Sequence, residues 1–227
     1  MKRTFWNIAA AAALGLLAVS AAKGATIIDN TGSDTGSVTS FGSVNTATYG
    51  QTLLNLSGPD THLDSFSMFL RERASGAGTL DLRGYVAEWD GIRASSILFE
   101  SATQTMNAAG DLQEFAFTPG IDLMAGGDYV FFLSISNLPA QPQSTFRMPR
   151  GTDTLDGRFV FLNNGTNFAA LTTSNWSTNF IGSADVWLKV GLSSPTSTPV
   201  PEPGTLALFG LGLAGLGYAW RRRQTRA

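Results

Sequence analysis

Hydrophobic and polar positions alternate through most of residues 26–192. Between Leu63 and Glu72, the side chains of Phe66, Met68 and Leu70 fall on one face, and polar residues occupy most of the other. A period of two residues is typical of a half-buried β-strand. Similar patterns predict further strands over residues 26–29, 49–56, 79–89, 93–102, 112–118, 128–136, 157–162 and 184–192.

Turn signals separate these predicted strands. Gly58-Pro59-Asp60 is typical of a turn, and Asp90-Gly91 of a tight hairpin. Residues 30–48 are rich in Ser, Thr, Gly and Asn, so we expect a loop there, and Pro139 and Pro142 interrupt the later part. No long helical period appears within residues 26–192. The pattern predicts an all-β fold, an antiparallel jelly-roll-like β-sandwich, with an immunoglobulin-like sandwich as the alternative.

The two ends of the chain have a different pattern. Lys2 and Arg3 precede an apolar core, Ile8–Val19, and small residues follow, which predicts a secretory signal peptide over residues 1–25. Near the other end, Thr205–Trp220 contains no charge. As a helix it would be roughly 24 Å long against a hydrocarbon core of about 30 Å, which predicts a short transmembrane helix.

The flanks of this apolar run complete a recognisable arrangement. The run is preceded by Pro201, Glu202 and Pro203 and followed by Arg221, Arg222 and Arg223. Together these parts resemble the PEP-CTERM sorting signal of Gram-negative bacteria. The resemblance implies recognition by an exosortase, removal of the tail, and delivery to the cell surface or an extracellular matrix. An ordinary C-terminal membrane anchor is the alternative.

The expected organisation therefore has four parts. These are a signal peptide (1–25) that signal peptidase removes, a β-sandwich domain (26–192), a Ser/Thr/Pro linker (193–199), and the sorting signal (200–227), with residues 205–220 in the membrane before processing. The chain has no cysteine, so no disulfide can form. Residues 26–192 carry sixteen acidic and eight basic side chains, a formal charge of −8. Nucleic-acid binding proteins favour basic surfaces, so we expect no nucleic-acid partner.

Few residues suggest catalysis. His62 is the only histidine, which makes zinc improbable and leaves a serine triad with a single candidate base. Glu88, Glu100 and Glu114 are candidates for the carboxylate pair of a glycosidase, but their spacing defines no pair. We therefore expect a protein that is not an enzyme and that needs no cofactor.

Binding is the more plausible role. Oxygen-rich loops suit calcium, for which the weak candidates are Asp60 and Asp64 near one turn, or Asp153 and Asp156 near another. Trp89, Trp176, Tyr49 and Tyr85 could form a sugar-stacking platform, whereas the pattern does not decide the side of Trp187. Aromatic residues in a sandwich more often belong to the core, but Trp176 lies in a Thr/Ser/Asn-rich stretch, so we take it as the best candidate for an exposed side chain that contacts glycan.

These observations lead to one main hypothesis and two alternatives. The main hypothesis is an exported envelope or matrix protein, transiently in the inner membrane, whose β-sandwich has a structural or adhesive role and binds polysaccharide. The alternatives are a secreted polysaccharide-active enzyme and a permanently membrane-anchored periplasmic domain.

Overall fold

The computed structural model describes residues 25–42, 46–73, 78–107, 112–139, 146–178, 184–195 and 212–213. The predicted signal peptide, apart from its last residue, and the predicted sorting signal, apart from residues 212–213, lie outside the described residues. Among the helices within the described ranges, none is long and apolar enough to cross a membrane.

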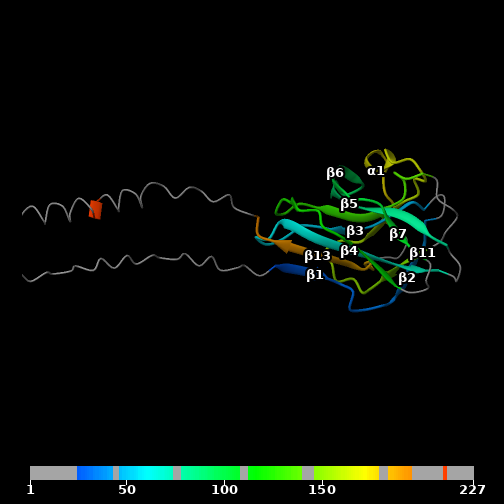
Figure 1. The fold of residues 1–227 in the computed structure, drawn as a ribbon, viewed down its shortest axis with the longest axis horizontal. Coiled ribbons are helices and arrows are strands. Elements are labelled where there is room, and N and C mark those ends of the chain that lie inside the picture. Colours follow the sequence, from blue (N-terminus) through cyan, green and yellow to red (C-terminus); the bar gives the residue numbers. More distant parts are fainter. Residues whose placement is uncertain are drawn as a thin grey trace, which may run out of the picture.

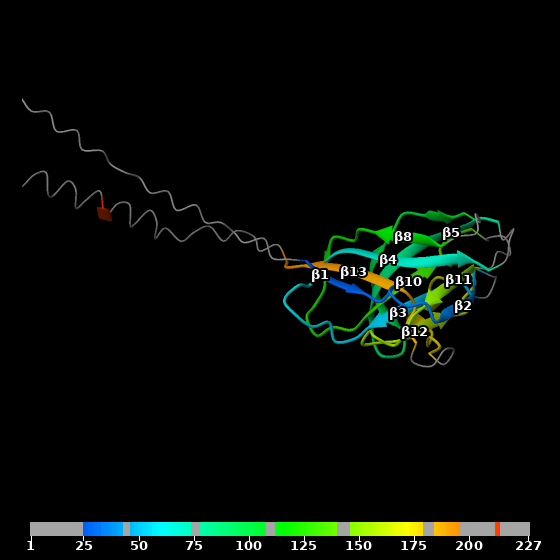
Figure 2. The same ribbon diagram turned by 90° about the horizontal axis from the view of Figure 1, so that it is seen from below.

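Over these ranges the chain forms two antiparallel sheets that face each other, with one short helix, α1 (Ala170–Thr173) (Figures 1 and 2). The seven-stranded sheet contains β1 (Thr26–Asp29), β2 (Gly36–Phe41), β4 (His62–Glu72), β8 (Gln113–Phe117), β9 (Ile121–Asp122), β11 (Phe146–Arg150) and β13 (Leu188–Ser193). The six-stranded sheet contains β3 (Thr48–Leu53), β5 (Leu80–Trp89), β6 (Ala94–Glu100), β7 (Gln104–Met106), β10 (Tyr129–Ser134) and β12 (Phe159–Leu162). The expected all-β sandwich is confirmed at this level.

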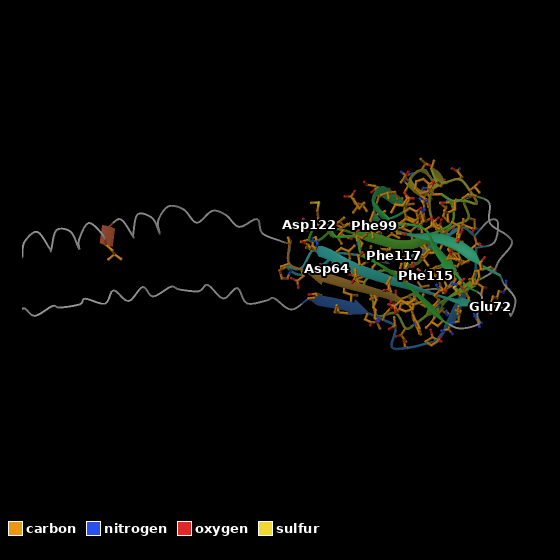
Figure 3. All side chains as sticks on the ribbon, in the orientation of Figure 1. Asp64, Glu72, Phe99, Phe115, Phe117 and Asp122 are labelled. Atoms are coloured by element: carbon orange, nitrogen blue, oxygen red, sulfur yellow. The ribbon has the colours of Figure 1, made fainter. Side chains whose placement is uncertain are left out.

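Aromatic side chains from both sheets fill the space between them (Figure 3). Phe66 of β4 stacks on Phe117 of β8 with ring centroids 4.7 Å apart, and it lies 5.4 Å from Phe131 of β10 in the other sheet. Gly84 of β5 faces the same cluster, and a Cβ at that position would lie 2.4 Å from the Phe117 ring. Glycine is therefore required there, because the ring occupies the space of a side chain.

The outer face of the six-stranded sheet is covered by a segment that includes α1 (Figure 1). A second apolar cluster forms beneath it, with the buried members Tyr85, Ala87, Trp89, Ala94, Val130, Phe132, Val160, Leu171 and Trp176. The backbone N–H of Trp176 donates to Ile92 O at 2.9 Å, and Ser177 pairs with Phe161 of β12. The sandwich therefore has a thin third layer on this side only of the six-stranded sheet.

The two ends of the described domain lie side by side (Figure 1). Thr26 of β1 pairs with Leu192 of β13. The Asp60 carboxylate holds both ends: Thr26 Oγ1 donates to Oδ2 at 2.7 Å, and Ser194 Oγ donates to Oδ1 at 2.6 Å. One side chain thus holds the residues that follow the predicted signal peptide and the beginning of the predicted linker, at Ser194.

A buried carboxylate connects the two sheets. Asp185 is fully buried and accepts hydrogen bonds from the backbone N–H groups of Thr154 and Leu155, each at 2.9 Å, and from Gln51 Nε2 at 2.6 Å. Gln51 Oε1 in turn accepts from the backbone N–H of Val186 at 3.0 Å. Burial raises the pKa of the Asp185 carboxyl, although these hydrogen bonds oppose the shift.

Several elements were not expected from the sequence. β2 lies within the segment predicted as loop, and β11 contains Pro149, a residue type that disfavours strands. Both form because they pair with each other, with Val38 opposite Met148. The predicted Asp90-Gly91 hairpin is confirmed, since the Asp90 N–H donates to Arg93 O at 3.1 Å and Gly91 has a φ of +95°.

Candidate functional site

A pocket of about 310 Å³ lies where β5 ends and β10 begins. We call it the acidic pocket; its lining residues are Glu88, Trp89, Ser95, Met124, Ala125, Gly126, Gly127, Asp128 and Tyr129. Asp122 lies two residues before Met124, where the lining segment 124–129 begins. It pairs with His62, and His62 pairs with Ser193. The acidic pocket is therefore at the end of the sandwich that carries both ends of the described domain.

The wall of the pocket between β9 and β10 is held by backbone and phenol hydrogen bonds. The N–H of Met124 donates to the hydroxyl oxygen of Tyr129 at 2.6 Å, and that hydroxyl donates to Met124 O at 3.3 Å. Leu56 makes two backbone hydrogen bonds to the same wall. Its N–H donates to Gly127 O at 3.0 Å, and its carbonyl oxygen accepts from the Gly126 N–H at 2.8 Å. This loop is thus preorganised, while the Met124 side chain, 72% exposed, stands at the rim.

Glu88 and Asp128 make the pocket acidic. Cross-strand register places Glu88 opposite Tyr129, and the Trp89 N–H donates to Asp128 O at 2.9 Å. Asp128 Oδ1 accepts from the Asn55 N–H at 2.7 Å. Among the described residues, the Glu88 carboxylate has no hydrogen-bond or ion-pair partner, and no basic side chain lines the pocket. Both carboxylates are therefore suited to accept hydrogen bonds from a neutral or cationic ligand.

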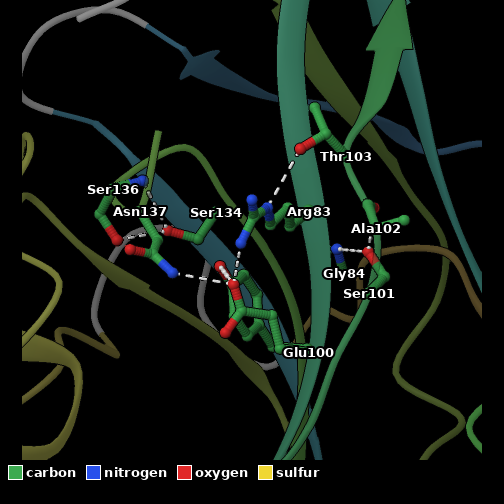
Figure 4. Close-up of polar contacts among 10 residues, drawn as sticks. Arg83, Gly84, Glu100, Ser101, Ala102, Thr103, Ser134, Ser136 and Asn137 are labelled. Atoms are coloured by element: carbon green, nitrogen blue, oxygen red, sulfur yellow. Dashed lines mark hydrogen bonds and ion pairs between the residues drawn. The ribbon is translucent and has the colours of Figure 1, made fainter. Parts of the chain in front are cut away.

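The three glutamates considered for catalysis are not brought together. Glu100, on β6, is occupied by Arg83, by the Tyr85 hydroxyl at 3.2 Å and by Asn137 Nδ2 at 2.8 Å (Figure 4). Burial acts to raise the pKa of Glu100, but the hydrogen bonds from these groups outweigh it, so the pKa is lowered overall. Glu114 is exposed on β8 of the other sheet. Glu88 lines the acidic pocket, and there its acidic neighbour is Asp128.

The aspartates considered for calcium lie in two places. Asp60 is bonded to the two domain ends, and Asp64 is exposed near His62, whose Nδ1 lies 2.6 Å from Asp122 Oδ1 (Figure 3). Asp153 and Asp156 are exposed in the segment before β12. Within the described part of the chain, no three His, Asp or Glu side chains are grouped as metal ligands. Calcium binding stays a prediction.

The prediction of an exposed Trp176 is wrong. Its side chain is 4% exposed and packs edge-to-face on Phe132 at 5.2 Å and on Trp89 at 5.8 Å. Its Nε1–H donates to Leu171 O at 2.9 Å, so its polar atom is also satisfied inside the protein. The polar composition of the surrounding segment is misleading because that segment covers a sheet. Trp176 thus belongs to the core and presents no face to a glycan.

Asp128 and Tyr129 are among the pocket residues that sequence reasoning did not select. Both fall in the strand predicted over residues 128–136, whereas in the structure β10 begins at Tyr129 and Asp128 directly precedes it. The sequence Gly126-Gly127-Asp128 could have pointed to this site, because a carboxylate directly after two glycines has no neighbouring side chains to block a ligand. Hydrophobic periodicity alone gave no reason to bring this turn next to Glu88.

Comparisons with known proteins address the sorting signal and the fold separately. Residues 199–223 match the family described as the PEP-CTERM protein-sorting motif. The chain therefore carries a PEP-CTERM sorting motif, consistent with an exosortase substrate, which indicates an exported protein that is processed at the membrane. No curated protein matches the chain.

The comparison with solved structures includes the following two matches. One is the clostridial cysteine protease Cwp84 C116A after propeptide cleavage, with a TM-score of 0.51 and 13% identity, covering 75% of this chain and 40% of that chain. The other contains the cysteine protease and lectin-like domains of Cwp84, a surface-layer-associated protein of Clostridium difficile, with a TM-score of 0.45, 14% identity, and coverage of 66% and 32%. This chain thus spans well under half of either protein, and the first likeness concerns the fold alone.

Proposed function

We propose that this exported protein reaches the cell surface or the extracellular matrix and there binds a neutral polysaccharide through the acidic pocket. The signal peptide, the membrane helix and the final location are parts of this proposal. The observation that carries the binding role is the acidic pocket itself, a preformed hollow with two carboxylates and no basic side chain among its lining residues.

The chemistry of the pocket supports a sugar ligand. Its volume of about 310 Å³ is at the lower end of ligand sites, which suits one or two sugar rings at a chain end. Carboxylates accept strong hydrogen bonds from hydroxyl groups, and the exposed Met124 side chain at the rim supplies apolar surface for the ring. An anionic ligand would be repelled by Glu88 and Asp128.

We also propose that the sandwich is a jelly roll. In support, β2-β11-β4-β8 are neighbours in one sheet and β3-β10-β5-β6 in the other. Successive strands from β3 to β5 alternate between the sheets, as they do when two Greek keys wrap around one core. An immunoglobulin-like sandwich would instead keep more sequential strands within one sheet.

The test is a panel of neutral polysaccharides with the protein isolated from cells. Glu88→Gln and Asp128→Asn should each weaken binding of the best ligand by about 10-fold or more, because a hydrogen bond to a charged group contributes about 1.5–3 kcal/mol. Glu114→Gln is the matched control, since it removes an exposed carboxylate from the other sheet. Equal effects of all three substitutions, or no binding across the panel, would refute the role of the pocket.

Catalysis is the second candidate, favoured by the presence of two carboxylates in one pocket. It would require release of sugar fragments from the bound polysaccharide, detected by mass spectrometry, and loss of that release in Glu88→Gln. We propose a binding module instead, because Glu100 and Glu114 do not join Glu88 and the Asp128 carboxylate is already bonded to the Asn55 N–H. Turnover that depends on Glu88 would overturn this choice.

Processing of the tail is tested by the intact mass of the protein recovered from cells. A mass lacking the residues beyond the Pro201–Pro203 motif, from material outside the inner membrane, is the expected result. A protein that retains residues 205–220 in the inner membrane would support permanent anchoring and contradict delivery to the surface.

A further inference from the structure

The outer face of the seven-stranded sheet carries aromatic and basic side chains side by side. Phe69 and Arg71 of β4 alternate with the buried Met68 and Leu70, so they point away from the core. Trp187, just before β13, packs edge-to-face on Phe69 at 5.8 Å, and the Arg71 guanidinium lies 5.7 Å from the Trp187 ring centroid. Trp187 remains partly exposed, and its Nε1–H donates to Ser33 O at 2.7 Å.

Two arginines face each other at this place. Arg71 of β4 is the cross-strand partner of Arg147 of β11, and like charges in directly opposite positions destabilise a sheet. Arg71 Nη2 bonds to Asp34 Oδ2 at 2.9 Å. Arg147 has no hydrogen-bond or ion-pair partner among the described residues, and its Nε is buried and unpaired, as is the Nε of Arg71.

Among the described residues, the two guanidinium groups of Arg71 and Arg147 have one carboxylate beside them, that of Asp34. The hydrogen bond from the Gly36 N–H is the main cause of its lowered pKa, and Arg71 and then Arg147 add to it. A guanidinium binds a carboxylate through paired N–H groups, and leaving such donors buried without a partner is costly. A second carboxylate, supplied by a ligand, would complete the set of two arginines and two carboxylates.

We propose that Arg71, Arg147 and Trp187 form a second binding site, which takes a carboxylate-bearing sugar unit of an acidic polysaccharide. The arginines bind the carboxylate, and the partly exposed Trp187 contacts the sugar ring. This inference goes beyond the proposed function, because it concerns another surface and a ligand that the acidic pocket would repel. The two surfaces are also separated: β4 runs from His62, beside the domain ends, to Arg71, nine residues or roughly 30 Å away (Figure 3).

The test compares polymers that differ in their carboxylates. The protein isolated from cells should bind polygalacturonic acid, and Arg147→Gln should weaken that binding by about 10-fold or more. Full methyl esterification of the same polymer should abolish binding at this site. Arg158→Gln, which removes an exposed arginine elsewhere, is the control and should leave binding unchanged.

Three results would overturn the proposal. The first is no binding of polygalacturonic acid. The second is an equal loss in Arg147→Gln and Arg158→Gln, which would indicate attraction by overall charge. The third is equally tight binding of polyglutamate with no effect of Trp187→Leu, which would indicate an acidic polypeptide or any polyanion.

Thermal stability and the pocket variants distinguish a binding role of Arg147 from a structural one. Without ligand, Arg147→Gln should leave the Tm unchanged or raise it, because it removes a like charge opposite Arg71. A marked drop in Tm would mean that Arg147 is structural. Glu88→Gln should not affect binding of polygalacturonic acid, so the second site and the acidic pocket can fail independently.

Discussion

The outer faces of the two sheets have opposite surroundings, although each carries a tryptophan. At the six-stranded sheet, Trp176 belongs to the covering segment that contains α1 and packs inward on Phe132 and Trp89 in a buried apolar cluster. On the seven-stranded sheet, Trp187 is partly exposed and contacts Phe69 and a guanidinium. The difference shows that the role of an aromatic residue depends on what covers its sheet, and not on the polarity of its own segment.

The two faces differ in the side chains that the attached segment brings: the segment with α1 contributes Leu171 and Trp176 to a buried apolar cluster. The covering segment is attached at Trp176 N–H to Ile92 O, and through Ser177 to the edge strand β12. The loop between β1 and β2 is also bonded to its sheet, through Asn30 to Leu188 and Thr35 to Arg150, but it touches the indole of Trp187 by a hydrogen bond only at Nε1, through Ser33 O. The first arrangement builds a third layer, whereas the second leaves a surface available for binding.

The largest expected effect separates the two tryptophans by stability. Trp176→Ala should lower the free energy of unfolding by about 3–5 kcal/mol, because it leaves a cavity and removes the bond to Leu171 O. Trp187→Ala should cost about 1–2 kcal/mol, since it removes one aromatic pair and one cation–π contact. Urea denaturation followed by circular dichroism measures both. Equal losses of free energy of unfolding in the two variants would contradict the proposed difference between Trp176 and Trp187.

A smaller effect concerns the carboxylates of the two sheets. Glu100 is bonded to Arg83, Tyr85 and Asn137, and its pKa in the folded protein is lowered despite its burial. Because the folded pKa lies below the unfolded one, its contribution is present above the unfolded pKa and is lost as pH falls through the folded pKa. Glu100→Gln should therefore cost about 1 kcal/mol near pH 7 and much less in acid.

The control for this prediction is Glu114→Gln on the seven-stranded sheet. Glu114 is exposed and has no hydrogen-bond or ion-pair partner in the described ranges, so its substitution should leave stability unchanged at both pH values. Urea titrations at pH 7 and in acid provide the measurement. A loss in Glu100→Gln that is the same at every pH would show that packing, and not the charge, is responsible.

The smallest effect is optical. Acrylamide should quench the fluorescence of Trp187 far more than that of Trp176, which is 4% exposed. Trp187→Phe should remove most of the quenchable emission of the domain, whereas Trp176→Phe should lower the intensity and leave the quenchable part in place. Strong quenching that survives in Trp187→Phe would mean that the covering segment opens in solution.

Local patterns predicted the strands in which hydrophobic and polar residues alternate. The alternation of Phe66, Met68 and Leu70 led to β4, and Asp90-Gly91 marked the β5–β6 hairpin. β2 and β11 were missed because each is stabilised by the other across more than a hundred residues, which no local window contains. The acidic pocket was half predicted: Glu88 was named, but its neighbour Asp128 lies directly before β10, which pairs with β5 only in the fold.

The sequence by itself determined the β-rich class of the fold and the PEP-CTERM motif at residues 199–223, because strand periodicity and a linear sorting motif are properties of consecutive residues. The tertiary structure alone decided that Trp176 is core and Trp187 is surface, and that Arg71 faces Arg147. It also decided that Asp60 holds the two domain ends and that Asp185 is buried between the sheets. These outcomes depend on which distant segments meet, and burial and pairing exist only after they have met.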